Sequence, residues 1–172
     1  MDPFATLGLT PRFDLSTEEL EARWREMQRA LHPDRHTDKP PAERRISLAK
    51  AVEVNEAYRA LRDDLSRAIA LLALRGFELK EGQDAAKPDP AFLMEVMELR
   101  EGLSEARQAR DLERARALGQ EVGQAQSATR AKVAQLFGSD AAPEQIAAQV
   151  SRMRYYRRFL DELEVIEEEA LS

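Results

Sequence analysis

Apolar residues recur at helical spacing along most of the chain, whereas the alternation typical of β-strands is almost absent. The first strong pattern predicts a helix over residues 17–31, and Ser16 followed by Glu19 has the spacing of a capping box at its start. Pro33 disfavours the helical conformation at His32 and therefore ends this helix. The apolar stripe of the predicted helix consists of Leu20, Trp24, Met27 and Leu31.

A second helical pattern follows a polar loop that ends at Pro40 and Pro41. Its stripe has the spacing of a helix that pairs with the first one in an antiparallel hairpin. A further apolar stretch, residues 68–74, extends or follows this second helix before Gly76 ends it. The stripe of the second helix consists of Ala51, Val54, Tyr58, Leu61 and Leu65.

The second half of the chain begins after a stretch without periodic apolar residues, Gly82–Pro88, which indicates a linker. Asp89 followed by Pro90 is typical of an N-cap with proline at the first helical position. Breaks at Ala109 and over residues 138–143 allow three antiparallel helices. The three predicted segments cover residues 90–107, 110–137 and 143–170. The sequence therefore predicts an all-α protein with a helical hairpin followed by an elongated three-helix bundle.

Composition excludes several classes of function. The chain has 172 residues, a net charge of −6, no cysteine and only two histidines. Thiolate metal sites, disulfides and cysteine nucleophiles are impossible, and the acidic balance argues against nucleic-acid binding. The first 30 residues lack the apolar run of a signal peptide, and no stretch of about 18 apolar residues occurs. We therefore expect a cytoplasmic protein that binds no membrane, metal or cofactor.

The segment over residues 92–105 carries two apolar faces instead of one. Its core stripe is formed by Phe92, Val96, Leu99 and Leu103. A second face carries Leu93, Met94 and Met97 together with Glu98, Glu101 and Glu105. Exposed apolar side chains beside carboxylates are typical of a protein-binding surface, and methionine adapts well to a partner. The alternative is a wide core face with ordinary solvated glutamates, and periodicity alone does not decide between them.

The tripeptide His32-Pro33-Asp34 lies between the two helices of the predicted hairpin. With the striped helix before it and the segment NEAYRAL, residues 55–61, behind it, the region resembles a J domain. J domains stimulate ATP hydrolysis by DnaK-type chaperones. The resemblance implies that the tripeptide contacts the chaperone ATPase, helped by Arg25 and Arg29 on the outward face of the first helix. A metal or acid–base site built on His32, Asp34 and His36 is the rival interpretation, and it lacks further histidine or cysteine ligands.

The whole chain resembles the HscB family of iron–sulfur co-chaperones. The resemblance depends on the J domain, on Arg75-Gly76-Phe77 and on the segment AFLMEVMELRE, residues 91–101. It implies a J domain over residues 1–75, a linker over 76–89 and a three-helix bundle over 90–172 that binds an IscU-type scaffold protein. By motif, the scaffold-binding residues are Leu93, Met94, Met97, Glu98, Glu101, Glu105 and Tyr155, with Tyr156 as the alternative to Tyr155.

The expected function is therefore that of a co-chaperone without enzymatic chemistry of its own. It would stimulate an HscA- or DnaK-type ATPase and deliver the IscU-type scaffold to it. A general J-domain adaptor for a different client is the alternative, and a helical structural adaptor is a third hypothesis.

Overall fold

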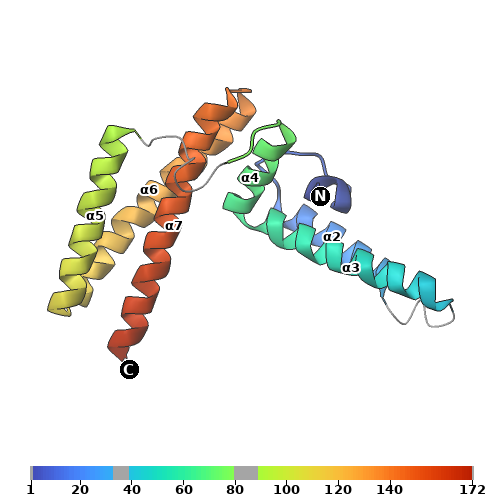
Figure 1. Cartoon of the computed structure of the whole chain (residues 1–172), viewed down its shortest axis with the longest axis horizontal. Helices are drawn as coiled ribbons and strands as arrows, with labels where there is room; N and C mark the ends of the chain where they lie inside the picture. Colours follow the sequence, from blue (N-terminus) through green and yellow to red (C-terminus); the bar gives the residue numbers. More distant parts are fainter. Residues whose placement is uncertain (1, 33–38, 80–88, 172) are drawn as a thin grey trace. The chain divides into compact units, whose positions relative to one another are not determined.

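The computed structural model describes residues 2–32, 39–79 and 89–171, and every regular element within them is an α-helix. The expected all-α class is thereby confirmed for these residues. The helices are α1 (Pro3–Leu7), α2 (Thr17–Leu31), α3 (Pro41–Arg62), α4 (Asp64–Leu74), α5 (Pro90–Ala109), α6 (Leu112–Gly138) and α7 (Pro143–Leu171) (Figure 1). They divide between two compact units, Met1–Glu78 and Leu79–Ser172. The division falls within the expected linker, residues 76–89.

The N-terminal unit begins with a short helix, α1, that the apolar pattern does not reveal. The Asp2 carboxylate caps this helix by accepting hydrogen bonds from the backbone N–H groups of Phe4 (2.9 Å) and Ala5 (3.2 Å). Gly8 ends it in the left-handed conformation, with φ of 64°. Phe4 and Leu7 are buried, and α1 lies against α2 and α3. It therefore closes the core that the hairpin leaves open.

Helix α2 spans the predicted residues, but its capping box forms only in part. The Ser16 hydroxyl accepts a hydrogen bond from the Glu19 backbone N–H at 3.3 Å, as expected. The Glu19 carboxylate instead pairs with Arg12 in the preceding loop. The nearby arginine offers an ion pair, so the reciprocal half of the box is replaced by a link to that loop.

The prediction that Leu65 continues the stripe of the second helix is wrong, because helix α3 ends at Arg62 and Asp63 interrupts the helical conformation. This residue has extended backbone angles (φ −88°, ψ 123°), and its carboxylate accepts a hydrogen bond from the Ser66 N–H at 2.8 Å. An aspartate that caps a new helix competes with continuation of the old one. Leu65 is therefore a buried residue of α4, which follows α3 as a separate helix.

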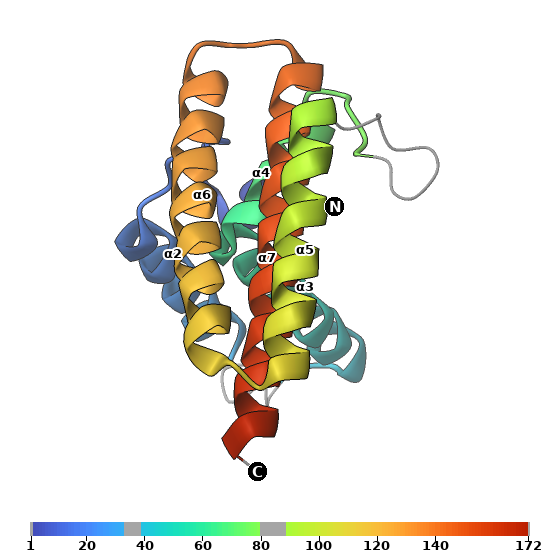
Figure 2. The same cartoon turned by 90° about the vertical axis from the view of Figure 1, so that its left-hand side faces the viewer.

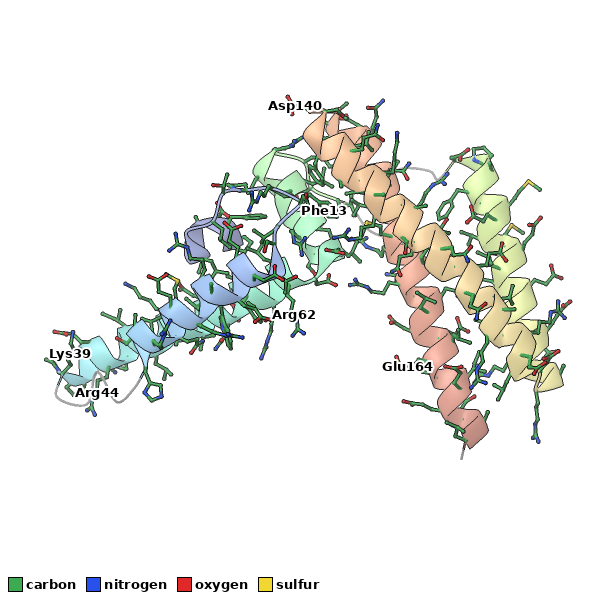
Figure 3. The ribbon with its side chains drawn as sticks, turned by 180° about the vertical axis from the view of Figure 1, so that it is seen from behind. Phe13, Lys39, Arg44, Arg62, Asp140 and Glu164 are labelled. Atoms are coloured by element: carbon green, nitrogen blue, oxygen red, sulfur yellow. The ribbon has the colours of Figure 1, made fainter. Side chains whose placement is uncertain are left out.

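The side chain of a buried arginine, Arg67, stabilises the turn between α3 and α4. Its guanidinium donates to the carbonyl oxygens of Leu61 (2.7 Å) and Phe13 (2.8 Å) and lies 3.1 Å from a carboxylate oxygen of Asp64. A charge that is 95% buried is tolerated only when it is paired and hydrogen-bonded in this way. Figure 3 shows Phe13 and Arg62 at one end of the hairpin and Lys39 and Arg44 at the other.

The C-terminal unit is the expected three-helix bundle. Figure 2 shows α5, α6 and α7 side by side, with short connections at opposite ends. The Asp89 carboxylate caps α5 and the Asp111 carboxylate caps α6, and Arg110 turns the chain between them with φ of 53°. The 27 residues of α6 extend over about 40 Å. All three predicted segments are confirmed, with ends that differ by one or two residues.

The bundle core consists of apolar side chains from all three helices. Its buried members are Phe92, Leu99, Leu103, Ala106, Ala115, Val122, Tyr156, Phe159, Leu163 and Ile166. Helices α6 and α7 approach closely where Gly119 faces Leu163. A Cβ atom added at Gly119 would overlap with Cδ2 of Leu163, whereas one added at Gly123 would meet no atom within 4 Å. Only at the first of these glycines would an added methyl group force a neighbouring side chain to move.

This difference predicts opposite effects of two alanine substitutions on one helix. We expect Gly119→Ala to lower the free energy of unfolding by about 1–2 kcal/mol, because overpacking outweighs the gain in helix propensity. The matched control, Gly123→Ala, should raise it by roughly 0.5–1 kcal/mol. Urea denaturation of both variants measures the two changes. Equal stabilisation by both would contradict the close packing of α6 on α7.

Candidate functional site

The tip of the α2–α3 hairpin presents His32 in an extended conformation. Helix α2 ends at Leu31, and His32 follows with φ of −58° and ψ of 132°, exposed to solvent. The expectation that the following proline ends the helix before His32 is confirmed. Pro33 and Asp34, the other two residues of the predicted chaperone contact, lie outside the described residues. The tip is the end of the hairpin that Lys39 and Arg44 mark in Figure 3.

Contacts among four side chains hold α2 against α3 next to this tip. We call this group, Trp24, Gln28, Asn55 and Tyr58, the Asn55 clamp. Trp24 stacks on Tyr58 with ring centroids 4.7 Å apart and an interplanar angle of 23°. The side-chain oxygen of Asn55 accepts hydrogen bonds from the Trp24 indole N–H (3.0 Å) and from the Gln28 amide (2.6 Å). Gln28 lies one helical turn before His32, so the clamp fixes the helix that carries the candidate contact. Sequence reasoning missed Asn55, since its partners lie on another helix.

The two arginines predicted to assist His32 are both exposed on the outer side of α2. Arg25 donates to the Glu21 carboxylate at 2.6 Å, and its side chain stays 65% exposed. A second carboxylate of α2, that of Glu26, forms an ion pair with Arg23 at 3.1 Å. In the described part of the chain, no carboxylate pairs with Arg29, which donates only to the Arg25 carbonyl oxygen at 3.3 Å. The positive charge of this surface is thus partly compensated at Arg25 and available at Arg29.

The two faces of α5 differ sharply in exposure. Phe92, Leu99 and Leu103 are 7%, 6% and 2% exposed, and Val96 packs against the same core. On the opposite side of the helix, Leu93 is 47% exposed, and Met94 and Met97 are each 63% exposed. The interpretation of a wide core face is therefore wrong. We call the surface formed by Leu93, Met94, Met97, Glu98, Glu101 and Glu105 the outer face of α5.

The three glutamates of the outer face are all exposed but are not equivalent. Glu105 accepts from Arg114, at the start of α6, at 2.7 Å. Within residues 2–32, 39–79 and 89–171, neither Glu98 nor Glu101 has a hydrogen-bonding or ionic partner. Negative charge therefore concentrates beside Met94 and Met97. Sequence reasoning missed the Arg114 pair because it forms across the turn between two helices.

The neighbouring tyrosines on α7 differ in position. Tyr156 is 2% exposed, and its hydroxyl donates to the Glu95 carboxylate at 2.6 Å. Tyr155 is half-buried, its hydroxyl donates to the Val96 carbonyl oxygen at 3.0 Å, and its ring meets Phe92 edge-on. Tyr156 is thus a core residue, and of the two only Tyr155 reaches the surface next to α5.

A cation at the start of α5 was not anticipated from the sequence. The Arg152 guanidinium lies 4.6 Å from the centre of the Phe92 ring and 3.0 Å from a carboxylate oxygen of Asp89. It therefore ties the first turn of α5 to the middle of α7. A cation over an aromatic ring contributes about 0.5–1 kcal/mol at a partly exposed position.

The described residues carry neither a metal-binding cluster nor a membrane-spanning helix. No group of three or more histidine, cysteine, aspartate or glutamate residues in the described ranges could hold a metal ion. The rival site built on His32, Asp34 and His36 falls mostly outside these ranges. Among the described helices, none combines the length and the apolar character needed to cross a membrane.

The chain is similar to known proteins over nearly its whole length. Residues 88–164 match the family described as the HSCB C-terminal oligomerisation domain, and residues 2–69 match the DnaJ domain. A co-chaperone protein HscB homolog of Vibrio vulnificus is 34% identical, with 98% of each chain covered, and one of Bordetella avium is 43% identical over 79% of each. Chaperone HscB from Vibrio cholerae superposes with a TM-score of 0.84 at 29% identity, covering 99% of both chains. Human co-chaperone HscB gives 0.87 at 28% identity, over 96% of this chain and 81% of that one.

The environment of Tyr156 predicts a loss of stability at alkaline pH. Burial, and then the hydrogen bond donated to Glu95, raise the pKa of the Tyr156 hydroxyl well above its usual range. The unfolded chain releases this proton above about pH 10 and the folded chain retains it, so the stabilisation present below pH 10 is lost as the pH rises. We expect Tyr156→Phe to flatten the fall in the free energy of unfolding between pH 9 and pH 11. Urea denaturation measures these slopes, and identical slopes for variant and wild type would contradict the prediction.

Proposed function

Because this chain belongs to the HscB family of J-domain co-chaperones, we propose that it activates an HscA- or DnaK-type ATPase and delivers an IscU-type iron–sulfur scaffold protein to it. The observation that carries the proposal is the outer face of α5, where apolar side chains and carboxylates are exposed together. The J domain and this face belong to separate compact units. One chain can therefore bind the chaperone and the client by different surfaces.

The J domain would act as a rigid contact and perform no chemistry. Exposed His32 follows a helix that the Asn55 clamp holds in register, so little conformational entropy is lost on docking. In the sequence, Asp34 stands two residues further on, and its carboxylate can accept a charge-assisted hydrogen bond from an arginine of the ATPase. Arg29 adds positive charge for an acidic patch on the same partner. The residues of this chain would thus influence an active site that belongs to another protein.

The outer face of α5 would bind the scaffold by apolar contact with charge recognition at its edge. Burying a side chain of the size of leucine or methionine contributes about 1.5–3 kcal/mol when it starts fully exposed, and these three start roughly half exposed. Glu98 and Glu101 favour a client surface with basic residues. Tyr155 extends the surface from α7. A chain without cysteine cannot hold an iron–sulfur cluster by thiolates, so the cluster would stay on the client.

Joining both sites in one chain raises the effective concentration of the scaffold near the chaperone. Nucleotide hydrolysis would then trap the scaffold on the chaperone. We expect this to take place in the cytoplasm, without a membrane, nucleic acid or cofactor. Recovery of an IscU-type scaffold in a pull-down with the purified protein separates this proposal from a general J-domain adaptor for another client.

The hairpin tip yields a first prediction for the ATPase. We expect His32→Gln to reduce stimulation of the chaperone ATPase to the level of the chaperone alone, because the presented side chain is lost while α2 is unchanged. Affinity for the scaffold, measured by calorimetry, should stay at the wild-type value. The chain's other histidine supplies the control, and His36→Gln should stimulate like wild type. Full stimulation by His32→Gln would overturn the role of the tip.

The outer face of α5 yields a prediction that separates binding from folding. We expect Leu93→Ala combined with Met97→Ala to weaken scaffold binding at least about tenfold, while the free energy of unfolding changes by roughly 0.5 kcal/mol per site. Calorimetric titration and urea denaturation measure the two quantities.

Two further variants serve as controls for the double variant. Leu99→Ala, on the buried face, should cost about 2–5 kcal/mol of stability. Val165→Ala removes another half-exposed apolar side chain, on α7, and should change neither quantity. If the double variant binds normally, or unfolds as readily as Leu99→Ala, the outer face is not the client site.

A further inference from the structure

The sulfur atoms of this chain are unevenly exposed. There is no cysteine, so the five methionines carry all of the sulfur. Among the described methionines, Met153 is 3% exposed and Met27 is partly buried, whereas Met94 and Met97 are each 63% exposed. There is no thiol to compete for a peroxide, so among the described methionines Met94 and Met97 are the most accessible to it.

Met94 and Met97 are neighbours on the outer face of α5. They are three positions apart, so their side chains occupy adjacent places on one side of the helix. Leu93 and Glu98 flank them, and Glu101 follows Met97 by one turn. The two most accessible sulfur atoms among the described residues thus lie within the surface assigned above to the client.

We propose that Met94 and Met97 are a reversible oxidation site through which hydroperoxides release the iron–sulfur scaffold. The inference rests on the proposed function, because it concerns the same surface. It adds a chemical class of reagent, the hydroperoxides, and a regulatory consequence.

The chemistry balances without any other reactant. The thioether sulfur attacks the terminal oxygen of the hydroperoxide, an S–O bond forms and the O–O bond breaks. The proton of the attacked oxygen passes to the departing oxygen, which leaves as water from hydrogen peroxide or as an alcohol from an organic hydroperoxide. Sulfur is oxidised by two electrons and the peroxide is reduced by two. Methionine sulfoxide reductases reverse the change.

The physical effect of oxidation follows from the neighbours of the two residues. A sulfoxide oxygen is a strong hydrogen-bond acceptor that needs a donor when it is buried. The adjacent Glu98 and Glu101 carboxylates are acceptors as well, so neither of them can donate to it. Burying the oxidised face against a client would therefore require the desolvation of a polar group at positions where apolar contact stabilised the complex. The bundle core lies on the opposite side of α5 and contains neither residue, so the fold should persist.

The test combines a measurement of reactivity with a measurement of binding. The full chain is treated with limiting hydrogen peroxide, and peptide mapping by mass spectrometry follows the addition of one oxygen to each methionine. We expect Met94 and Met97 to be oxidised well before Met153. Calorimetric titration with purified IscU-type scaffold should then show affinity lowered by about tenfold or more, with an unchanged circular dichroism spectrum. Methionine sulfoxide reductase should restore the affinity.

The matched control is Met94→Leu combined with Met97→Leu, which preserves apolar volume and removes the oxidisable sulfur. This variant should bind the scaffold before and after peroxide treatment with equal affinity. Oxidation of Met153 as fast as Met97, or undiminished binding by the doubly oxidised wild type, would overturn the switch and leave the client site standing. Failure of the untreated protein to bind the scaffold would overturn the proposed function, and the switch with it.

Discussion

A helix that packs against its neighbours on one side must leave the opposite side to solvent, and the functional design of the C-terminal unit depends on this constraint. Helix α5 buries Phe92, Leu99 and Leu103 against α6 and α7. Leu93, Met94 and Met97 are thereby turned outward. An ordinary bundle helix would carry polar residues there, whereas α5 carries a leucine and two methionines beside carboxylates. The same helix can therefore hold the bundle together and offer a client an apolar surface.

The core of the bundle, and not its ion pairs, holds α5 in place. Surface pairs such as Arg107 with Glu169 and Arg116 with Glu167 connect the ends of the helices, at 2.9 and 2.6 Å. Each is exposed to solvent and contributes less than about 1 kcal/mol. The buried aromatic and aliphatic side chains contribute several times as much per residue. The charges are thus free to tune recognition, as at Glu98 and Glu101, without endangering the fold.

The hairpin of the J domain solves a different problem, which is to present a single residue from the end of two long helices. Helix α2 has only one buried residue, Leu20, so its C-terminal half has little core to rest on. The stack of Trp24 on Tyr58 and the two hydrogen bonds accepted by Asn55 supply the missing constraint. A satisfied polar contact of this kind specifies one register between two helices, where apolar contact alone would allow several. Because the register of α2 is fixed in this way, His32 at its end has a defined position.

The sequence by itself determined the elements and the candidate surfaces. Apolar spacing located α2, α5, α6 and α7 to within two residues, and the resemblance carried by residues 32–34 and 91–101 indicated the family. These features are local, because the helical period and proline geometry act over a few residues. The sequence did not determine the break at Asp63, since an aspartate inside a periodic stripe caps a new helix only when the surrounding structure accepts the turn. It also left open whether the second face of α5 is buried.

Only the tertiary structure decided which side chains meet. The links from Trp24 to Asn55, from Asp89 to Arg152 and from Glu95 to Tyr156 each join residues that are far apart in sequence. No single-helix pattern contains them, because each depends on the rotation of one helix against another. The exposure of Met94 and Met97 is decided in the same way. Packing of the opposite face of α5 fixes that rotation, and with it the surface that the protein presents to its partners.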